Sequence, residues 1–360
     1  MPTIAHAHRL TIATIATDTP MGAQAYQEQI ATRAERALSD TGGEAWQVDR
    51  AIVRSLRSRL DGNRRLPMSR VATASPRTRR LIGRALYGSA GVTHRMNLEL
   101  PPAAGGDVVT LHDVVAWLFP DESAPVPAAA REAREADAVI CVSEFTAQAA
   151  TDLLGIRDPH VVHNGVDARF FDAAPLEAAH RSRLGLADRF VLHAGGASTR
   201  KNLEALADAW PRVRAERPDL QLVLSGPPHP RRTRLFEGMP GVLMVGRVAD
   251  DLVPGLVAAA TAVVVPSLYE GFGLPVLEAM AANVPVVAAN TSSLPEVAGA
   301  AAILVNPTGD GIAEGLLAVT APNAGTASLV RAGRARAAEF TWERAALAHA
   351  RVWRAVGVSP

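Results

Sequence analysis

Short, uninterrupted runs of apolar residues, many of them β-branched, recur along the chain and most constrain its fold. A strand with one exposed face alternates apolar and polar residues, whereas a strand covered on both faces is apolar throughout. The uninterrupted runs therefore predict buried strands of parallel sheets. They lie at residues 10–16, 108–111, 138–142, 161–162, 190–193, 221–224, 242–245, 262–265, 284–288 and 301–305.

The segments between these runs carry apolar residues at helical spacing, as in the series Leu203, Leu206, Trp210 and Val213. Alternating strands and helices indicate an α/β fold with two Rossmann-like, doubly wound parallel sheets. A polar, turn-rich stretch near residues 172–186 separates the two sets of strands. We therefore expect an N-terminal domain at residues 1–170, a C-terminal domain at 171–340, and a final helix at 341–360 that packs back on the N-terminal domain.

The composition excludes several classes of protein. With 48% hydrophobic and 20% charged residues in a chain of 360, disorder, collagen and coiled coil are ruled out. The one cysteine, Cys141, lies in an apolar run and is expected to be a core residue rather than a reactive thiol. The longest uncharged stretches, 252–269 and 279–295, contain prolines and polar residues that a membrane-spanning helix would not favour. Because no secretory signal pattern is present, we expect a cytoplasmic protein.

Charge is distributed unevenly along the chain, whose formal net charge is only +1. Residues 50–95, here called the basic segment, contain twelve arginines and one acidic residue, Asp61, so they carry +11 and the remainder carries −10. The segment is either a solvated surface or a surface that faces anionic lipid head groups or a phosphorylated acceptor. The second interpretation would place the protein peripherally at the inner face of the membrane. Nucleic acid is not an expected partner, because Tyr87 is the segment's one aromatic residue.

The most informative stretch is residues 266–280, which follow an apolar run and read Pro-Ser-Leu-Tyr-Glu-Gly-Phe-Gly-Leu-Pro-Val-Leu-Glu-Ala-Met. Gly271 and Gly273 permit a tight turn whose backbone approaches a ligand closely. Pro275 suits the first position of a new helix. The backbone amides of residues 272–274 would then lie at a helix N-terminus, where an anion binds well.

Two carboxylates flank this turn. Glu270 lies just before it, and Glu278 is expected in the first turn of the helix. With no further Asp or His nearby, the two groups are better placed to accept hydrogen bonds from hydroxyls than to hold a metal. Hydroxyls and a phosphate together indicate a sugar nucleotide. The alternative for Glu278 is that it only stabilises the N-terminus of its own helix.

A second glycine turn, at Gly195 and Gly196, follows another apolar run and precedes a helix. Arg200 and Lys201 lie at the helix start, where a positive charge is unfavourable unless an anion is bound. Arginine can bind a diphosphate with two N–H groups, and lysine supplies a compact charge. Lys201 is the only lysine, so 36 of the 37 basic residues are arginine. This makes Lys201 a candidate for a position where arginine cannot substitute.

These motifs resemble those of the retaining glycosyltransferases of the GT-B fold in glycosyltransferase family 4, which include bacterial mannosyl- and glucosyltransferases. Glu270 and Glu278 are similar to the family's Glu-x7-Glu signature, and residues 195–202 to its phosphate loop. Three further segments are similar to family segments: Val162-His-Asn-Gly-Val-Asp167, Leu111-His-Asp113 and Leu294-Pro-Glu-Val-Ala-Gly299. The resemblance implies two Rossmann-like domains with the donor site in the crevice between them.

The resemblance also implies roles for individual residues. Glu270 would accept hydrogen bonds from the donor sugar and Glu278 from the ribose. Arg200 and Lys201 would neutralise the leaving diphosphate, and His112 would approach from the other domain. The catalytic positions are thus His112, Arg200, Lys201 and Glu270. The donor-binding positions are Gly22, Asn164, Gly196, Arg247, Val248, Gly271, Phe272, Gly273, Leu274 and Glu278.

One departure concerns the first strand, which in the family is usually followed by two glycines, whereas this chain offers Gly22 alone. Acceptor residues are therefore not carried over. For the whole chain the resemblance implies transfer of a hexose, mannose being the leading candidate, from a GDP- or UDP-sugar to an acceptor glycan, glycolipid or small molecule. Configuration would be retained by front-face attack, with no metal and no cofactor besides the donor substrate. Such transfer would serve cell-envelope, glycolipid or secondary-metabolite glycan synthesis.

Other functions have to be weighed against this one. A GT-B sugar-nucleotide epimerase and a non-catalytic sugar-nucleotide-binding protein fit the same motifs. A GT-B phosphorylase is disfavoured, because it would need a lysine for a pyridoxal-type cofactor and Lys201 is already assigned. A nicotinamide-dependent enzyme is disfavoured because no Gly-x-Gly-x-x-Gly follows the first apolar run.

Overall fold

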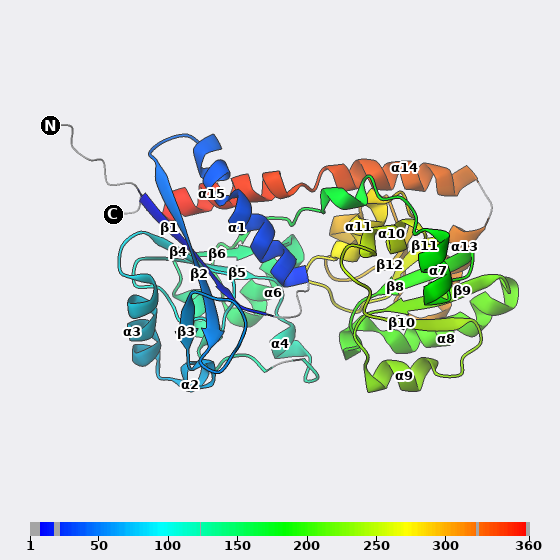
Figure 1. Ribbon diagram of the computed structural model, residues 1–360, viewed down its shortest axis with the longest axis horizontal. Helices are drawn as coiled ribbons and strands as arrows, with labels where there is room; N and C mark the ends of the chain where they lie inside the picture. The colour runs from blue at the N-terminus through cyan, green and yellow to red at the C-terminus, as the bar shows by residue number, and fades with distance from the viewer. Residues whose placement is uncertain (1–7, 18–21, 123, 322–323, 358–360) are drawn as a thin grey trace. The chain divides into compact units, whose positions relative to one another are not determined.

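A computed structural model of the protein describes residues 8–17, 22–122, 124–321 and 324–357. The chain forms two compact units, of which the first contains Met1–Gly165 with Thr341–Pro360 and the second contains Val166–Phe340. The division falls slightly before the expected boundary at residues 170 and 171. Each unit contains one parallel sheet flanked by helices, so the predicted pair of doubly wound, Rossmann-like sheets is confirmed (Figure 1).

In the described part of the first unit, seven strands form a sheet in the order β3-β2-β1-β4-β5-β6-β7, and neighbouring strands are parallel. The strands are β1 (His8–Ile15), β2 (Trp46–Ser55), β3 (Arg64–Leu66), β4 (Val92–Arg95), β5 (Gly106–Leu111), β6 (Ala138–Cys141) and β7 (His160–Val161). The helices are α1 (Gly22–Asp40), α2 (Met68–Thr73), α3 (Pro76–Tyr87), α4 (Val115–Leu118), α5 (Ala129–Arg134), α6 (Glu144–Leu154) and α15 (Trp342–Gly357). Cys141 is fully buried, which confirms it as a core residue.

The sequence does not predict β2, β3 or β4, because these strands carry charged side chains. The four residues of β4 are all buried, although the strand ends in Arg95. The Arg95 guanidinium donates from Nε to Oδ1 of Asp107 at 2.8 Å and from Nη2 to Oδ2 at 2.7 Å. A buried charge is tolerated when it is paired and hydrogen-bonded in this way. Asp107 lies on the neighbouring strand β5, so the pair also fixes the register of the two strands.

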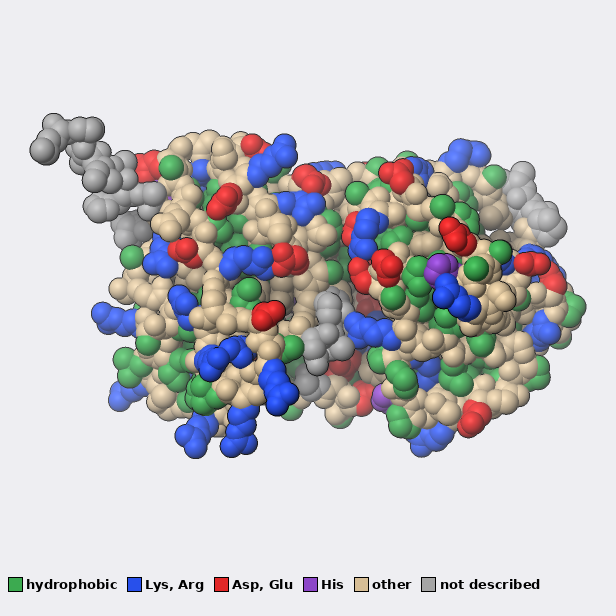
Figure 2. All heavy atoms as spheres, viewed as in Figure 1, with side chains coloured by type: hydrophobic (Ala, Val, Ile, Leu, Met, Phe, Trp, Pro, Cys, Tyr) green, Lys and Arg blue, Asp and Glu red, His purple; other side chains and the backbone are tan. Residues whose placement is uncertain are grey.

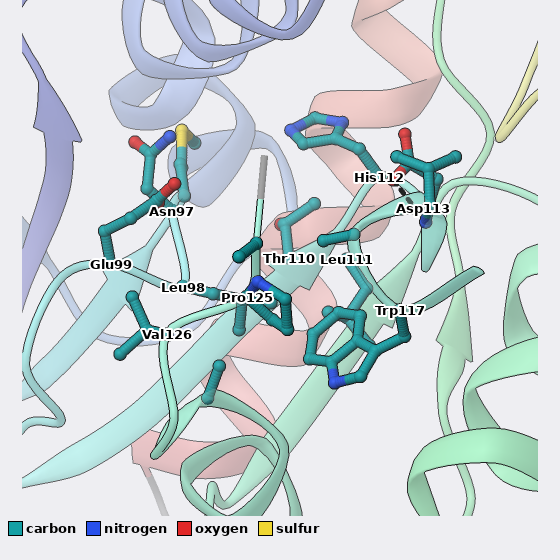
Figure 3. A pocket seen from close by; sticks show the side chains of 15 residues that line it. Asn97, Leu98, Glu99, Thr110, Leu111, His112, Asp113, Trp117, Pro125 and Val126 are labelled. Atoms are coloured by element: carbon teal, nitrogen blue, oxygen red, sulfur yellow. Dashed lines mark hydrogen bonds between the residues drawn. The ribbon is translucent and has the colours of Figure 1, made fainter. Parts of the chain in front are cut away.

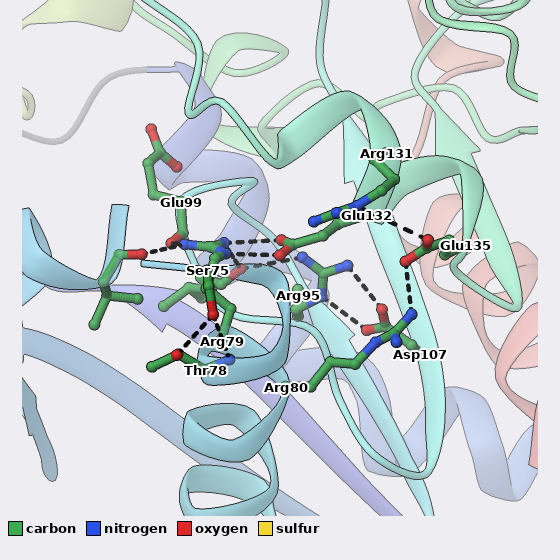
Figure 4. Close-up of polar contacts among 12 residues, drawn as sticks. Ser75, Thr78, Arg79, Arg80, Arg95, Glu99, Asp107, Arg131, Glu132 and Glu135 are labelled. Carbon is green, nitrogen blue, oxygen red and sulfur yellow. Dashed lines mark hydrogen bonds and ion pairs between the residues drawn. The ribbon is translucent and has the colours of Figure 1, made fainter. Parts of the chain in front are cut away.

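Arg79 on α3 is also buried, and it too is paired with a carboxylate (Figure 4). It donates from Nε and Nη2 to the two carboxylate oxygens of Glu132 on α5, at 2.7 and 2.9 Å. Both Arg79 and Arg95 belong to the basic segment. The interpretation of that segment as surface is therefore wrong for these two arginines, because each is neutralised inside the first unit by one carboxylate.

In the described part of the second unit, six strands form a sheet in the order β10-β9-β8-β11-β12-β13, again with parallel neighbours. The strands are β8 (Arg189–Ala194), β9 (Leu220–Ser225), β10 (Val242–Gly246), β11 (Ala262–Val265), β12 (Val286–Ala289) and β13 (Ile303–Val305). The α-helices are α7 (Ala178–Leu184), α8 (Leu203–Glu216), α9 (Pro230–Phe236), α10 (Val253–Ala258), α11 (Leu274–Ala281), α12 (Leu294–Ala298), α13 (Gly309–Thr320) and α14 (Ala324–Ala338). Short 3-10 turns lie at η1 (Ala168–Phe170) and η2 (Thr199–Lys201). Every apolar run predicted in this half overlaps a strand.

The final helix, α15, packs against α1 and against β4 and β5 of the first unit (Figure 1). Its buried face includes Trp342, Ala345, Ala346, His349 and Trp353. A chain of five hydrogen bonds then joins the helix to the core of the unit. It runs from Trp353 Nε1 to His94 Nδ1 (3.2 Å), His94 Nε2 to Thr110 Oγ1 (2.7 Å), Thr110 Oγ1 to Tyr26 Oη (2.8 Å), Tyr26 Oη to His349 Nε2 (2.6 Å), and His349 Nδ1 to Ala345 O (2.7 Å).

The two ends of this chain fix the direction of every hydrogen bond in it. The indole N–H of Trp353 can only donate, and the carbonyl of Ala345 can only accept. His94 therefore accepts at Nδ1 and donates from Nε2, whereas His349 donates from Nδ1 and accepts at Nε2. Both rings must be neutral for this arrangement. Burial lowers the pKa of His349 to about 4, and burial together with the neighbouring histidines lowers the pKa of His94 well below its ordinary value.

Acid should weaken the first unit, because its folded state binds fewer protons than the unfolded chain. Unfolded histidines titrate near pH 6.5, so the stability is complete above that pH and is lost as the pH falls towards 4. For His94 and His349 together, we expect the free energy of unfolding to fall by about 4 kcal/mol between pH 7.5 and 5. Urea denaturation followed by tryptophan fluorescence measures this change.

The matched control for this prediction is His349→Gln, whose side-chain oxygen can still accept from Tyr26. It should remove about half of the pH-dependent loss attributed to the pair. An identical loss in the variant and the wild type would contradict the assignment of the acid sensitivity to these histidines.

Candidate functional site

The strand order of the second unit determines where its functional residues gather. Chain connections run outward in opposite directions from β8 and β11, which are adjacent in the sheet. In open parallel sheets a ligand binds at the carboxyl ends of the strands on either side of such a reversal. The segments that follow these two strands contain residues 195–202 and 266–274, the two glycine-rich turns that the sequence singles out.

Three of the predicted catalytic residues meet at this point. Glu270 accepts from Lys201 Nζ at Oε1 (2.6 Å) and from Arg200 Nη1 at Oε2 (3.0 Å). The side chains of Arg200, Lys201 and Glu270 are 16%, 13% and 10% exposed, so the cluster is largely shielded but open to solvent at one side. Residues of the two glycine-rich turns are thus in direct contact in the second unit.

Glu270 is held as a permanent anion. Burial alone would raise its pKa, but the charges of Lys201 and Arg200 outweigh burial and, with hydrogen bonds from Lys201 and Ser267, lower the pKa to about 2. The Ser267 hydroxyl donates to Oε1 at 2.7 Å. Sequence reasoning missed Ser267, and its position three residues before Glu270 in the same turn was the available signal.

The turn after β8 is tied to the turn after β11 by Asn202. Asn202 adopts a left-handed conformation with φ 54° and is the N-cap residue of α8, which begins at Leu203. Its Nδ2 donates to the carbonyl oxygens of Pro266 (3.0 Å) and Pro307 (2.9 Å). The amide of Leu268 also donates to the carbonyl of Arg200 at 2.7 Å. These bonds hold the two cations in place opposite Glu270.

The glycine turn after Glu270 is held by two serines that the sequence analysis missed. The Ser293 hydroxyl lies within hydrogen-bond distance of the carbonyl oxygens of Glu270 (2.9 Å) and Phe272 (2.8 Å). The Ser292 hydroxyl accepts from the amide of Glu270 at 3.1 Å. Gly273 has φ 103°, and a Cβ there would lie 2.8 Å from the Leu294 side chain, so this position requires glycine.

Glu278 differs from Glu270 in its hydrogen bonds and in the charges around it. It lies in the second turn of α11 rather than the first, because the helix begins at Leu274 instead of Pro275. In the described part of the chain no hydrogen bond reaches its carboxyl group. Burial and the nearby charges of Asp167 and Asp250 raise its pKa to about 7, against the opposing charge of Arg169. Glu278 is thus a carboxylate with unused acceptor capacity.

The remaining predicted donor-binding residues lie in both units. In the second unit, Gly196 is part of the turn after β8, and Arg247 and Val248 follow β10, with Arg247 exposed and Val248 partly buried. In the first unit, Gly22 is the exposed first residue of α1, and Asn164 is buried with no partner for its Oδ1 among the described residues.

His112 lines a pocket of the first unit, about 190 Å³ in volume, at the carboxyl ends of β4 and β5 (Figure 3). Asn97, Glu99 and Trp117 line the same pocket. The His112 ring packs edge-on against Tyr26 with centroids 4.7 Å apart, and no described residue bonds its buried Nε2. Burial, and to a smaller extent His349, lowers its pKa to about 4. His112 is therefore a neutral ring with a free polar edge.

The chemistry available in the second unit is that of an anion site beside hydroxyl acceptors. Two cations converge on one carboxylate, and backbone amides lie at the starts of α8 and α11 nearby. Among the residues that the structure describes, no group of three His, Cys, Asp or Glu side chains is placed to hold a metal ion. The arrangement suits a ligand that carries both phosphate and hydroxyl groups.

Comparison with known sequences places these segments in a family. Residues 188–322 match the profile "Glycosyl transferases group 1", and residues 103–170 match the profile "Glycosyltransferase Family 4". The first match contains the cluster of Arg200, Lys201 and Glu270. The second contains His112 and Asn164.

Individual relatives extend this similarity. The chain is 30% identical over 274 residues to the O-antigen chain mannosyltransferase B of Escherichia coli. This match covers 70% of this chain and 71% of that protein. It is 30% identical over 222 residues to the GDP-mannose-dependent alpha-(1-6)-phosphatidylinositol dimannoside mannosyltransferase of Mycobacterium tuberculosis, covering 60% of this chain and 57% of that protein. The sucrose-phosphate synthase structure of Thermosynechococcus elongatus has a TM-score of 0.73 at 21% identity, covering 97% of this chain and 98% of that one.

The two glutamates should respond oppositely to neutral substitution. Glu270→Gln leaves two cations unpaired in a shielded site, and we expect it to destabilise the second unit by about 3–5 kcal/mol. Glu278→Gln should be neutral or stabilising at pH 8, because a carboxyl whose pKa is raised contributes stability that is lost as the pH rises through about 7. Urea denaturation at pH 8 compares the two variants. Equal losses in both would contradict the charge assignments.

Proposed function

The chain belongs to glycosyltransferase family 4 and is a glycosyltransferase, and on that premise we propose that it transfers a hexose with retention of configuration. The donor is a nucleotide diphosphate sugar, GDP-mannose in the first instance and a UDP-sugar as the second choice. Support for mannose comes from the two relatives above, whose names are those of mannosyltransferases and of which one is GDP-mannose-dependent. The acceptor is a hydroxyl of a glycan, a glycolipid or a small molecule.

The observation that carries this proposal is the contact of Lys201 and Arg200 with Glu270. In the proposed complex the two cations face the donor diphosphate and stabilise the charge that grows on it as the glycosidic bond breaks. Because these cations supply the positive charge, no divalent metal is needed. Glu270, an anion at every working pH, accepts hydrogen bonds from the hydroxyls of the sugar and orients it.

Retention follows from front-face attack in this proposal. The bond between C1 and the diphosphate oxygen breaks while the acceptor oxygen bonds to the same face of C1. The acceptor's proton passes to an oxygen of the leaving phosphate, so no protein carboxylate acts as nucleophile or base. His112 assists from the first unit, where its pocket is the proposed acceptor site. Glu278 accepts from the ribose hydroxyls.

Two other functions are compatible with the same site. An epimerase would change the sugar nucleotide without an acceptor, and a binding protein would hold it unchanged. A thermal-shift panel of UDP-, GDP- and dTDP-sugars identifies the donor. A ligand that binds the folded protein raises its melting temperature, and the increase grows with the affinity and the concentration of the ligand. NMR of the incubated donor, with and without candidate acceptors, then distinguishes transfer from epimerisation and gives the anomeric configuration. Transfer that EDTA abolishes and a metal restores would overturn the metal-free mechanism.

Lys201→Arg should keep the fold and the charge but reduce transfer. A guanidinium is planar and larger than an ammonium, so it cannot take the place of Lys201 Nζ, 2.6 Å from Glu270, without displacing the groups around it. We expect kcat/KM to fall about 100-fold, corresponding to roughly 2.7 kcal/mol of transition-state stabilisation. Arg234→Lys, at an exposed position of α9, is the matched control. Near wild-type activity of Lys201→Arg would show that the single lysine is only an accident of composition.

We further propose that the basic segment binds an anionic membrane surface peripherally. Eight of its arginines are exposed: Arg57, Arg59, Arg64, Arg65, Arg70, Arg77, Arg80 and Arg84. On α3, Arg77, Leu81 and Arg84 follow helical spacing, and Leu81 is 68% exposed between the two charges. Figure 2 displays arginine side chains gathered over the part of the first unit that holds α2 and α3. No helix within the described ranges is long and apolar enough to cross a membrane.

Arg77→Gln combined with Arg84→Gln should weaken binding to vesicles that contain anionic lipid. Each arginine near such a surface contributes about 1 kcal/mol, so we expect a loss of about thirtyfold at low salt. Arg36→Gln with Arg351→Gln removes the same charge from exposed positions on α1 and α15 and should have little effect. Co-sedimentation measures both, and binding that ignores lipid charge or salt would rule out this contact.

A further inference from the structure

Arg232 on α9 is a buried cation whose position the sequence analysis did not single out. Its side chain is largely enclosed, and the residue is 3% exposed. Nη2 donates to the carbonyl oxygens of Gly195 and of Gly196 (3.0 Å), and Nη1 donates to that of Pro227 (2.9 Å). Its Nε has no hydrogen-bond partner, and among the described residues no carboxylate lies within ion-pair distance.

A guanidinium bonded only to neutral carbonyls is unusual inside a protein. Burying a charge without a counter-ion costs free energy, which hydrogen bonds to carbonyl dipoles offset only in part. Burial accordingly lowers the pKa of Arg232. The two buried arginines of the first unit, Arg79 and Arg95, each have a bidentate carboxylate partner. Arg232 differs from them in lacking its anion.

The carbonyls that Arg232 holds determine where two backbone amides point. In a trans peptide the N–H points away from the C=O of the same unit. Fixing the carbonyls of Gly195 and Gly196 therefore turns the N–H groups of Gly196 and Ala197 away from Arg232. Neither of these two amides has an acceptor in the described part of the protein. Successive unpaired amides of this kind form an anion-binding concavity.

The same turn borders the cation cluster. A Cβ at Gly195 would lie 3.9 Å from Lys201 Cε and 3.7 Å from Nε2 of His193. His193 is 2% exposed, and its Nδ1 bonds the carbonyl of Val264 (3.2 Å), so Nε2 is a bare acceptor with no partner in the described structure. Unsatisfied donors and a bare acceptor thus meet around the Gly195 turn beside Lys201. A ligand with phosphate and hydroxyl groups would satisfy both kinds.

We propose that Arg232 is a positioning residue for the donor diphosphate: it sets the Gly195–Gly196 turn so that two amides face the phosphates, and its charge favours a diphosphate over a monophosphate. The inference rests on the proposed donor function and deepens it. Gly226 is also needed for the contact between Arg232 and the Gly195–Gly196 turn. It has φ 140°, and a Cβ there would lie 2.0 Å from the carbonyl oxygen of Gly195 and 3.0 Å from Nη2 of Arg232, so a side chain would separate the two.

Arg232→Gln and Arg232→Lys test this role, with Arg234→Gln as the matched control on the exposed face of the same helix. Calorimetry with GDP, GMP, UDP and UMP measures the dissociation constants. For the nucleoside diphosphate that the wild type binds, we expect Arg232→Gln to raise Kd about tenfold while the Kd of the matching monophosphate changes less than twofold. Arg232→Lys should fall between the wild type and Arg232→Gln, because it keeps the charge but not the planar fork. Arg234→Gln should match the wild type.

The outcomes separate this inference from the function on which it rests. If the wild type bound neither diphosphate, the donor function itself would fail. If the wild type bound one and Arg232→Gln bound it equally well, or lost diphosphate and monophosphate affinity alike, the positioning role would be overturned while the donor function stood. Should Arg232→Gln not fold, as judged by its melting curve, Arg232→Lys decides by the same comparison of diphosphate with monophosphate.

Discussion

The functional end of the second unit depends on one ion cluster, in which Glu270 bonds both Lys201 and Arg200. Each charge in it is shielded and would be costly alone, so the three must be present together. They come from the two turns that flank the reversal of strand order, and their attraction draws those turns to one place. Asn202, Ser292 and Ser293 then fix the backbone around the charges, and Ser267 bonds the carboxylate of Glu270 itself.

Arginine and lysine have different tasks in this protein. Arg79 and Arg95 each bind one carboxylate through two parallel hydrogen bonds. The first pair connects α3 to α5, and the second connects β4 to β5. Lys201 touches Glu270 through a single nitrogen at 2.6 Å. An ammonium is a compact charge, so Lys201 can keep its bond to Glu270 while another of its N–H groups faces a second anion. A guanidinium at this position would need more room beside Glu270.

The sequence was sufficient to predict most strands, because buried parallel strands leave uninterrupted apolar runs. A common donor site for residues 200, 201 and 270 was implied only by the resemblance to family 4, and the ion cluster that they form was not predicted. The sequence did not predict β4, whose Arg95 is buried because Asp107 on β5 pairs with its guanidinium. Nor did it predict His193, Arg232 or Ser293 near the site. Their importance depends on partners distant in sequence, such as the Gly195 carbonyl for Arg232, and no local spacing reveals such a partner.

Glu270 and Glu278 show how one short segment obtains two kinds of carboxylate. Both are shielded, so burial raises the pKa of each, and the difference lies in their neighbours. Two cations keep Glu270 charged, with a pKa of about 2, whereas Asp167 and Asp250 oppose the ionisation of Glu278 and bring its pKa to about 7. Two titratable groups whose surroundings push their pKa values apart have different roles in a site. Glu270 is a fixed charge that already accepts three side-chain hydrogen bonds. Glu278 accepts none within the described structure and so gains most from new donors, because each hydroxyl that bonds its carboxylate lowers the cost of holding that charge.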